Sequence, residues 1–328
     1  MRSFKNYIPP NPENWTGRKT GSESKPLYYY QSVKLLPLKR IDTKSIEDNS
    51  ITILGYECEE GIKRNNGRLG SQKGPKAIKE ALAKLAVHYK EGALYDGGST
   101  FCVNGNLEEC QSSTSELVSA IINSKSTPLL IGGGHDIAYA NFEGILNSID
   151  HTSTIGIINF DAHFDLRLNN EGPNSGTPFY QCAKLCQEKN IRFNYLVLGI
   201  QKASNTSDLF ETAEKLEVKY LLNDELFDID LAQHLRTIEE FIENKDHIYV
   251  SIDMDCFSSA FAPGVSAASP IGISPELFFP LFQCIIKSDK IISLDIAETN
   301  PTYDLDGRTS KLVAQIIDFY IRETFQQV

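Results

Sequence analysis

Two observations predict an α/β fold whose parallel sheet is covered by helices on both faces. Short apolar runs recur along the chain, and they are continuously apolar rather than alternating. Segments with helical periodicity separate many of these runs. Continuously apolar strands that alternate with helices are typical of a parallel sheet buried between two helical layers. No internal repeat or linker divides the 328 residues, so we expect a single α/β domain over residues 1–328.

Seven apolar runs rich in β-branched residues are the expected strands, at residues 51–58, 127–134, 154–163, 194–201, 219–223, 247–255 and 291–298. Helices are expected between or after them, at residues 74–89, 115–124, 231–244, 274–287 and 310–325. Ser274 and Pro275 are residue types preferred at the N-cap and the first position of a helix. Residues 1–50 are polar and rich in proline and asparagine, which predicts an irregular N-terminal arm.

The composition excludes several classes of partner. A formal net charge of −11 argues against nucleic acid or an anionic membrane, because both require a basic surface. No apolar run approaches the roughly 20 residues that span a bilayer. Residues 1–15 lack the apolar core of a signal peptide, so the expected location is the cytoplasm. The seven cysteines include no CxxC pair, so we expect neither a zinc knuckle nor a disulfide framework.

Charged residues gather just after three of the expected strands. Together they supply two imidazoles and four carboxylates, from His135, Asp161, His163, Asp165, Asp253 and Asp255. If the strands continue through "NFDAHFD" and "SIDMD", alternation places Asp161, His163 and Asp165 on one face of their strand, and likewise Asp253 and Asp255 on one face of theirs. Like charges buried there require a cation. The glycines of "LLIGGGHD" suggest a phosphate loop as an alternative, but no Lys-Ser/Thr pair follows them.

This set of ligands favours two divalent cations. Carboxylates with some imidazole suit Mn²⁺ and related ions better than the thiolate sites of structural zinc. A catalytic zinc usually has three protein ligands, and six are too many for it. Six are suited to two metal ions about 3.5–4 Å apart with a position left for hydroxide. In the open sheet of an α/β protein, such a site belongs at the carboxyl ends of the strands.

The motifs "GGGHD", "DAHFD", "SIDMD" followed by "APGV", and "SLDIAETNP" resemble, in this order, those of the ureohydrolase (arginase–agmatinase) family. Upstream, "GIKRNNGRLGSQKGPKAIKEAL" resembles the N-terminal segment of that family, so the resemblance runs from about residue 54 to the end. It implies a three-layer α/β/α sandwich with a mostly parallel sheet of about eight strands. It also implies two Mn²⁺ ions per chain, although other divalent metals are accepted by the same ligands, and a homo-oligomer.

The resemblance also implies which residues bind each of the two metal ions and which residues are catalytic. One ion would be held by His135, Asp161, Asp165 and Asp253. The other would be held by Asp161, His163, Asp253 and Asp255. The implied reaction is attack of metal-bridging hydroxide on an amidine carbon and cleavage of a C–N bond. Asp165 would carry the proton to the departing amine, and Glu298 of "DIAETNP" would pair with the cationic end of the substrate, unless it forms a structural salt bridge. The expected catalytic residues are thus Asp165, Glu298 and the ligand His135.

Two departures from arginases narrow the substrate. Arginases carry a histidine just past a Ser-Gly in the loop after the "DAHFD" motif, whereas Ser175-Gly176 is followed here by threonine. Arginase activity is therefore not expected. The second departure is Arg167 of "DLR", where arginases have a short polar residue. An arginine there is suited to bind a carboxylate through two parallel hydrogen bonds, with an ion pair to Glu171 as the alternative. Ser175 is the second expected substrate contact, and Arg68 is either a further anion receptor or a structural residue.

At these positions, the segments "DAHFDLR" and "SGTPF" resemble those of the family members that hydrolyse N-formimidoyl-L-glutamate to L-glutamate and formamide in histidine degradation. The expected substrate is therefore a small dicarboxylic amidine. The alternative is a hydrolase of guanidino acids such as guanidinobutyrate, which would release urea. A metal-stabilised scaffold without activity would show an incomplete set of ligands, and all six are present. For the distal carboxylate, the sequence offers only regions, in loops around residues 13–30, 168–180 and 200–208.

Overall fold

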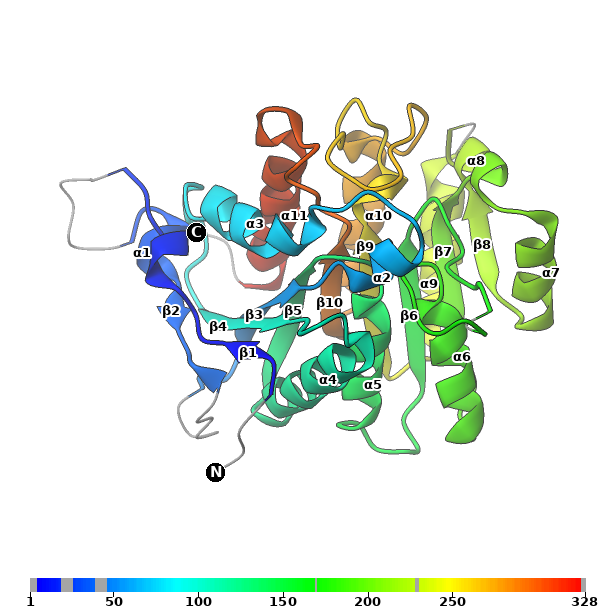
Figure 1. The fold of residues 1–328 in the computed structure, drawn as a ribbon, viewed down its shortest axis with the longest axis horizontal. Coiled ribbons are helices and arrows are strands. Elements are labelled where there is room, and N and C mark those ends of the chain that lie inside the picture. The colour runs from blue at the N-terminus through cyan, green and yellow to red at the C-terminus, as the bar shows by residue number, and fades with distance from the viewer. Residues whose placement is uncertain (1–4, 19–25, 39–45, 169, 228–229, 326–328) are drawn as a thin grey trace.

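A twisted sheet runs through the middle of the molecule (Figure 1). The computed structural model describes residues 5–18, 26–38, 46–168, 170–227 and 230–325, and within these the sheet has ten strands. Eight of them form the parallel body of the sheet, in the spatial order β4 (Ala93–Phe101), β3 (Ser50–Glu57), β5 (Ser126–Gly132), β10 (Ile291–Ala297), β9 (His247–Asp253), β6 (Ile155–Phe160), β7 (Tyr195–Ile200) and β8 (Lys219–Leu222). Two short strands pair with β4: β1 (Tyr7–Ile8) runs antiparallel to it and β2 (Lys34–Leu35) parallel. The expected parallel sheet of about eight strands is confirmed, with two short additions.

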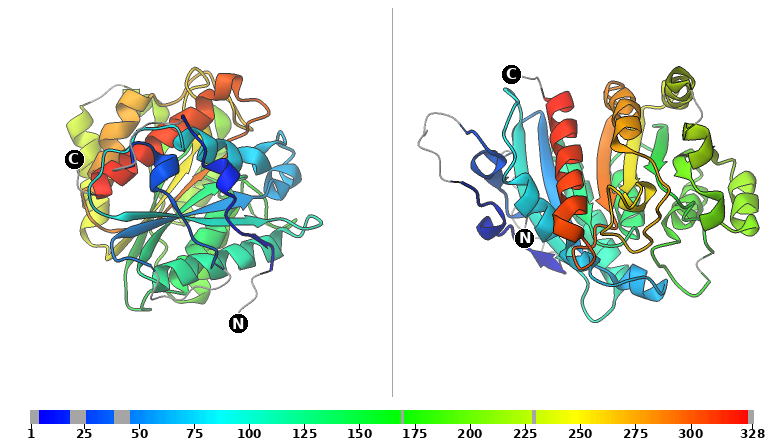
Figure 2. Two further views of the ribbon diagram at one scale, coloured as in Figure 1. Left: turned by 90° about the vertical axis from the view of Figure 1, so that its left-hand side faces the viewer. Right: turned by 90° about the horizontal axis from the view of Figure 1, so that it is seen from above.

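Helices cover both faces of this sheet, which gives three layers (Figure 2). One face carries α3 (Gly74–Leu82), α9 (Leu231–Glu243), α10 (Pro275–Ile286) and α11 (Arg308–Thr324). The other carries α4 (Leu107–Asn123), α5 (Ile137–Leu146), α6 (Pro178–Glu188) and α7 (Ser207–Lys215). The remaining helices are short: α1 (Tyr29–Ser32), α2 (Glu60–Arg64) and α8 (Asn223–Phe227). The apolar side chains divide accordingly into two large buried clusters, one on each side of the sheet.

The five expected helices are present, with shifted ends. The helix expected at residues 74–89 ends at Leu82, because Ala86 pairs with Tyr28 of the N-terminal arm instead of continuing the helix. Ser274 and Pro275 are the N-cap and the first residue of α10, as expected. Parts of the predicted N-terminal arm, residues 1–4, 19–25 and 39–45, lie outside the described residues. In the described chain, no helix combines the length and the apolarity needed to cross a membrane.

Strand β4 was not among the expected strands, because it contains Asp96-Gly97-Gly98, a combination typical of a turn. Asp96 is fully buried and accepts hydrogen bonds from Lys79 Nζ at 2.7 Å, Trp15 Nε1 at 2.7 Å and the Gly98 amide at 2.9 Å. Gly98 has a φ of +89°, and the register between β3 and β4 shifts beside it. Three donors thus replace the water that a buried carboxylate loses.

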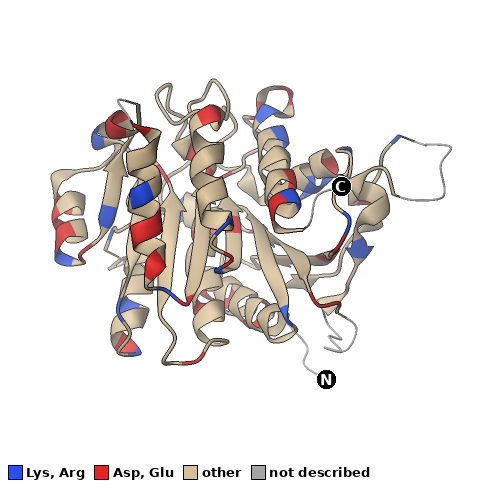
Figure 3. Cartoon of the chain, turned by 180° about the vertical axis from the view of Figure 1, so that it is seen from behind, with Lys and Arg blue, Asp and Glu red and all other residues tan. Residues whose placement is uncertain are grey.

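Charged residues lie mainly on the outer helices. Seen from behind, both acidic and basic residues are scattered over these helices and the loops that connect them (Figure 3). This distribution fits a sheet whose two faces are both covered, because the charged side chains then stay in water.

Candidate metal centre

The three acidic motifs meet at one edge of the sheet. Strands β5, β10, β9 and β6 are neighbours in that order, and all four run in parallel. Their carboxyl ends therefore lie side by side, where open α/β sheets bind ligands. The residues that follow them include His135, Asp161 and Glu298, while Asp253 is the last residue of β9.

The three glycines before His135 serve close packing. The amide of Gly133 donates to Tyr56 O at 2.9 Å, and that of Gly134 donates to Cys58 O at 3.0 Å. A Cβ atom on Gly133 would lie only 1.7 Å from the Cys58 carbonyl oxygen. Only glycine fits there, so the backbone of this loop is held against the end of β3. His135 is thereby fixed just before α5.

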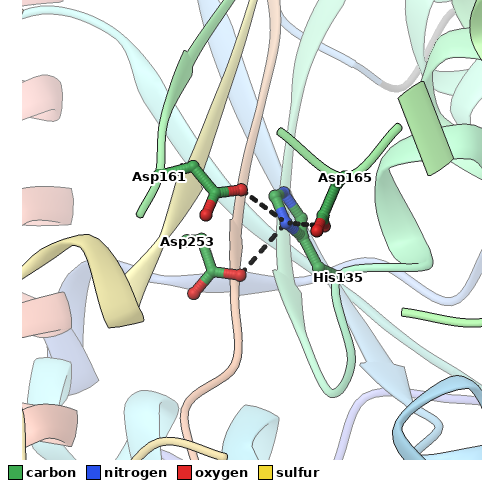
Figure 4. Close-up of side chains that lie close together, drawn as sticks. All are labelled: His135, Asp161, Asp165 and Asp253. Atoms are coloured by element: carbon green, nitrogen blue, oxygen red, sulfur yellow. Dashed lines mark ion pairs between the residues drawn. The ribbon is translucent and has the colours of Figure 1, made fainter. Parts of the chain in front are cut away.

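Three carboxylates surround one nitrogen of His135 (Figure 4). The Nδ1 atom lies 2.9 Å from Asp165 Oδ2, 3.0 Å from Asp253 Oδ2 and 3.2 Å from Asp161 Oδ2. These four side chains are buried. Four electron-rich groups thus point at the same small volume.

The other nitrogen of His135 shows which tautomer this arrangement favours. Nε2 lies 2.9 Å from Ser251 Oγ, and Ser251 donates its only hydroxyl hydrogen to Asp295 Oδ1 at 2.6 Å. Asp295 also accepts from Asn141 and from the Tyr249 hydroxyl. Ser251 must therefore accept from Nε2–H, which leaves a lone pair on Nδ1. A lone pair facing three carboxylates fits a divalent cation, so these residues are suited to hold one.

A second group adjoins the first. His163 Nδ1 lies 3.2 Å from Asp255 Oδ2 and 3.5 Å from Asp161 Oδ1. Asp161 thus offers one oxygen to each group. In each group, one ligand atom from every residue lies within 4.8 Å of those of the others. The structure brings together all six residues singled out from the sequence.

The backbone conformation that brings these residues together differs from the expected one. Strand β6 ends at Phe160, so the expectation that Asp161, His163 and Asp165 alternate along a strand is wrong. They lie in a loop, and a φ of +52° at Asp165 turns its side chain back toward the others. The Asp161 carboxylate also accepts from the His163 amide at 2.7 Å, which closes this turn.

Asp253 and Asp255 do not alternate along a strand either. Asp253 ends β9, but Asp255 belongs to a short 3₁₀ turn, Met254–Cys256, and does not continue the strand. The Asp253 Oδ1 atom accepts from the Asp255 amide at 2.8 Å. This cap fixes the turn, and the turn brings Asp255 beside His163.

Asn205 holds the loop of Asp161 and His163 and was not foreseen. Its Oδ1 accepts from the Phe164 amide at 3.0 Å, and its Nδ2 donates to Ala162 O at 2.9 Å. The only signal in the sequence is its place in the loop after an expected strand. Asn205 therefore acts through the backbone of the loop that presents the aspartates.

The charges in this cluster influence one another strongly. Burial and the nearby Asp161 raise the pKa of Asp165 to about 6. Burial, Asp255 and Asp161 raise the pKa of Asp253 to about 7. Burial would also raise the pKa of Asp161, but in metal-free protein the adjoining imidazoles of His135 and His163, whose own pKa values the aspartates raise, outweigh it and hold the pKa of Asp161 below its usual range. Asp165 and Asp253 thus hold protons more readily than exposed carboxyl groups when no metal is bound, and a metal ion would displace those protons.

Glu298 lies beside the cluster with one oxygen free. Its Oε1 accepts from the His135 amide at 3.1 Å, while Oε2 is buried and has no hydrogen-bond partner among the described residues. No described basic side chain is within ion-pair distance of it, so the alternative of a structural salt bridge is not realised. A free, buried carboxylate oxygen suits a cationic group that enters from outside.

A cavity of about 290 Å³ opens onto this cluster. Its floor is acidic and is lined by His163, Asp165, Asp253, Asp255 and Glu298. Its wall is polar or basic and includes Asn65, Arg68, Arg167, Ser175, Ser204 and Asn205. Residues 13–30, one of the regions expected to bind a distal carboxylate, contribute no described residue to it, and residues 19–25 and 169 lie outside the described residues.

Arg167 is oriented by a residue that the sequence analysis did not single out. Its Nη1 donates to Asn65 Oδ1 at 2.7 Å, and Asn65 Nδ2 donates to Ser175 Oγ at 3.1 Å. The expected alternative, an ion pair with Glu171, is absent, and no other described carboxylate lies within 4.0 Å of Arg167. Since Asn65 supplies the hydrogen to Ser175, the Ser175 hydroxyl keeps its own hydrogen for another acceptor.

The fold and the paired His/Asp groups define a member of a metal-dependent hydrolase family. The arginase family model matches residues 49–321, and the chain belongs to the arginase family. It is 37% identical to a formimidoylglutamase of Clostridium tetani over 330 residues, which cover 98% of this chain and 97% of that protein. It is 40% identical to a formimidoylglutamase of Legionella pneumophila over 315 residues, covering 95% and 96%.

Solved structures agree on the fold. The formimidoylglutamase of Bacillus subtilis superposes with a TM-score of 0.79 at 22% identity, covering 93% of this chain and 95% of that one. The formiminoglutamase of Trypanosoma cruzi with Mn²⁺ superposes with a TM-score of 0.76 at 22% identity, covering 86% and 95%. The resemblance noted in the sequence is therefore confirmed for the whole α/β region.

Proposed function

We propose that this protein is a formimidoylglutamase that binds two Mn²⁺ ions and cleaves N-formimidoyl-L-glutamate to L-glutamate and formamide. The observation that carries the proposal is the composition of one cavity. It joins two metal-binding groups and the free oxygen of Glu298 to Arg167, an arginine with no carboxylate partner among the described residues. Relatives of that name, at 37–40% identity over nearly the full length, support the same activity.

The residues that would hold the two metal ions are the six named above. His135, Asp161, Asp165 and Asp253 form one group, and Asp161, His163 and Asp255 form the other. The family resemblance adds Asp253 as a second shared ligand. When bound, two divalent cations lower the pKa of water so that hydroxide is available near neutral pH.

The protein's own groups orient the substrate and move its proton. Glu298 binds the amidinium through its free oxygen, at the edge of the metal groups. Arg167 binds a carboxylate in a bidentate manner, and Ser175 donates its hydroxyl hydrogen to the same carboxylate. Asp165 reaches both the metal groups and the cavity, so it takes a proton from the attacking water and returns it to the departing glutamate nitrogen.

A panel of substrates with Mn²⁺-loaded protein tests the proposal. N-formimidoyl-L-glutamate, 4-guanidinobutyrate, L-arginine and agmatine are compared by release of glutamate and formamide or of urea. Glutamate release with negligible urea is expected. Urea from 4-guanidinobutyrate would favour the alternative, a guanidino-acid hydrolase, on the same fold and metal centre. We also propose, from the sequence, that the enzyme is a homo-oligomer located in the cytoplasm.

A further inference from the structure

Arg68 shares the cavity with Arg167 and is also free of acidic partners. Its Nε donates to Ser266 O at 2.9 Å and its Nη2 donates to Val265 O at 2.5 Å. The ring centroid of Tyr303 lies 4.2 Å from its guanidinium carbon. These neutral contacts fix the guanidinium group without neutralising it. Among the described residues, no carboxylate lies within ion-pair distance, and Nη1 has no partner.

A nearby arginine shows the contrast. Arg64 lies four residues earlier and donates to Glu108 Oε1 at 2.7 Å, and its Nε lies 3.5 Å from Glu60 Oε1. That charge is compensated within the protein. In a chain with a formal net charge of −11, acidic partners are plentiful. The two arginines that line the cavity nevertheless have none, so their charge is available to a ligand.

One short segment, residues 65–68, connects the two arginines. Asn65 holds Arg167 at 2.7 Å, and Arg68 follows Asn65 by three residues, a span of at most about 11 Å. Between them, Asn66 has a φ of +59°, which turns the chain. A Cβ atom on Gly67 would lie 2.5 Å from Ser266 Oγ, so the segment is also packed closely against the loop that holds Arg68.

We propose that Arg68 binds the second carboxylate of the substrate, while Arg167 binds the first. This inference rests on the proposed function and names the residue that selects a dicarboxylic substrate. Three of the four carboxylates on the floor of the cavity are assigned to the metal ions and the fourth, Glu298, to the amidinium, so receptors for the two substrate carboxylates have to come from the wall. Arg68 and Arg167 supply two positive charges there, and each can form a bidentate pair. A substrate with one carboxylate, such as 4-guanidinobutyrate, would need only one of them.

Charge-neutral analogues of the substrate test this assignment. N-formimidoyl-L-glutamate is compared with its α-amide and its γ-amide, each of which lacks one negative charge. The variants are Arg68→Gln and Arg167→Gln. Each variant should raise KM for the diacid about 10- to 100-fold, because a charged hydrogen bond is lost. With one of the two amides the effect of Arg68→Gln should disappear, and with the other amide the effect of Arg167→Gln should disappear.

The matched control is Arg308→Gln. Arg308 is exposed, donates Nη1 to Ala260 O at 2.9 Å and does not line the cavity. It should leave KM unchanged for all three compounds. If Arg68→Gln does not fold, Arg68→Lys takes its place, because it keeps the charge but loses the bidentate geometry. It should raise KM for the diacid by a smaller factor, and with the same amide that factor should disappear.

Two results would overturn the role of Arg68 alone. One is an equal loss of kcat/KM for the diacid and both amides, which would mean that Arg68 only supports the loop of Val265 and Ser266. The other is an unchanged KM for the diacid. Wild-type protein that releases no glutamate from N-formimidoyl-L-glutamate would instead overturn the proposed function, and the role of Arg68 with it.

Discussion

Ser251 Oγ lies 2.9 Å from His135 Nε2, and this contact decides which nitrogen of the imidazole faces the carboxylates. Ser251 belongs to β9 and reaches Asp295 of β10, so two neighbouring strands orient a residue that follows β5. The hydrogen bond stabilises the neutral tautomer with its lone pair on Nδ1. Groups that orient metal ligands in this manner contribute to affinity without touching the ion.

Ser251→Ala should therefore weaken metal binding. Without an acceptor for Nε2–H, the His135 ring loses its preferred tautomer and orientation. We expect a fall in Mn²⁺ affinity of about 10- to 100-fold, measured by titration calorimetry on metal-free protein. Ser126→Ala is the control, because it removes another buried hydroxyl contact, with Thr52 at 2.8 Å, at the opposite end of β5. Equal Mn²⁺ affinity in the two variants would contradict the role of Ser251.

Asp253→Asn should stabilise the metal-free protein but abolish metal binding. In metal-free protein the amide can donate to His135 Nδ1, 3.0 Å from the present Oδ2, and one negative charge is removed from a crowded group. The melting temperature without metal should rise. The increase that Mn²⁺ causes in wild-type protein should be lost, together with turnover.

Thermal unfolding with EDTA and with Mn²⁺, followed by metal analysis, checks both parts of this expectation. Glu240→Gln removes an exposed charge on α9 and should behave as wild type in both conditions. A variant at position 253 that retains two metal ions and full activity would rule out Asp253 as a ligand.

Asn65→Ala should act on substrate binding rather than on chemistry. Arg167 would lose the acceptor at 2.7 Å that fixes its guanidinium group, and Ser175 would lose a donor at 3.1 Å. We expect KM for N-formimidoyl-L-glutamate to rise several-fold, with kcat and Mn²⁺ content little changed. Asn65→Asp keeps the acceptor for Arg167 but neutralises its charge, so it should raise KM further. A fall in kcat at constant KM would show that Asn65 acts elsewhere.

Lys79→Ala should destabilise the fold without altering the site. Lys79 and Asp96 form a buried ion pair at 2.7 Å, with 2% and 0% of their side chains exposed. Loss of the lysine leaves a buried, partly compensated carboxylate, which costs about 3–5 kcal/mol. Lys76→Ala breaks an exposed pair with Glu80 and should cost at most about 1 kcal/mol. Urea denaturation of Mn²⁺-loaded protein compares the two, and similar losses would contradict the importance of burial.

Much of the fold could be predicted from the sequence, because its strands are continuously apolar and the pattern needs no partner to be recognised. Strand β4 could not, since Asp96-Gly97-Gly98 favours a turn until Lys79 and Trp15 are known to lie beside it. Those contacts join residues 17 and 81 positions apart. Local patterns carry no information about such distant partners.

Part of the candidate site could likewise be predicted from the sequence, and part could not. The six His and Asp residues could be grouped because each follows a strand, and parallel strands end at one edge. The grouping holds although the alternation from which it was argued does not extend beyond Phe160. Asn65, Asn205 and Ser251 could not be found, because each acts through a contact with a residue far away in the sequence.

The two shortest strands have a consequence for how copies of this chain meet. β1 pairs with Ser99 and Thr100 of β4, and β2 pairs with Tyr95 and Asp96 of the same strand. A buried outer strand with free amides would otherwise recruit a strand from another molecule. Four residues of the N-terminal arm thus occupy backbone groups of β4 that would otherwise be open to edge-to-edge pairing with another molecule.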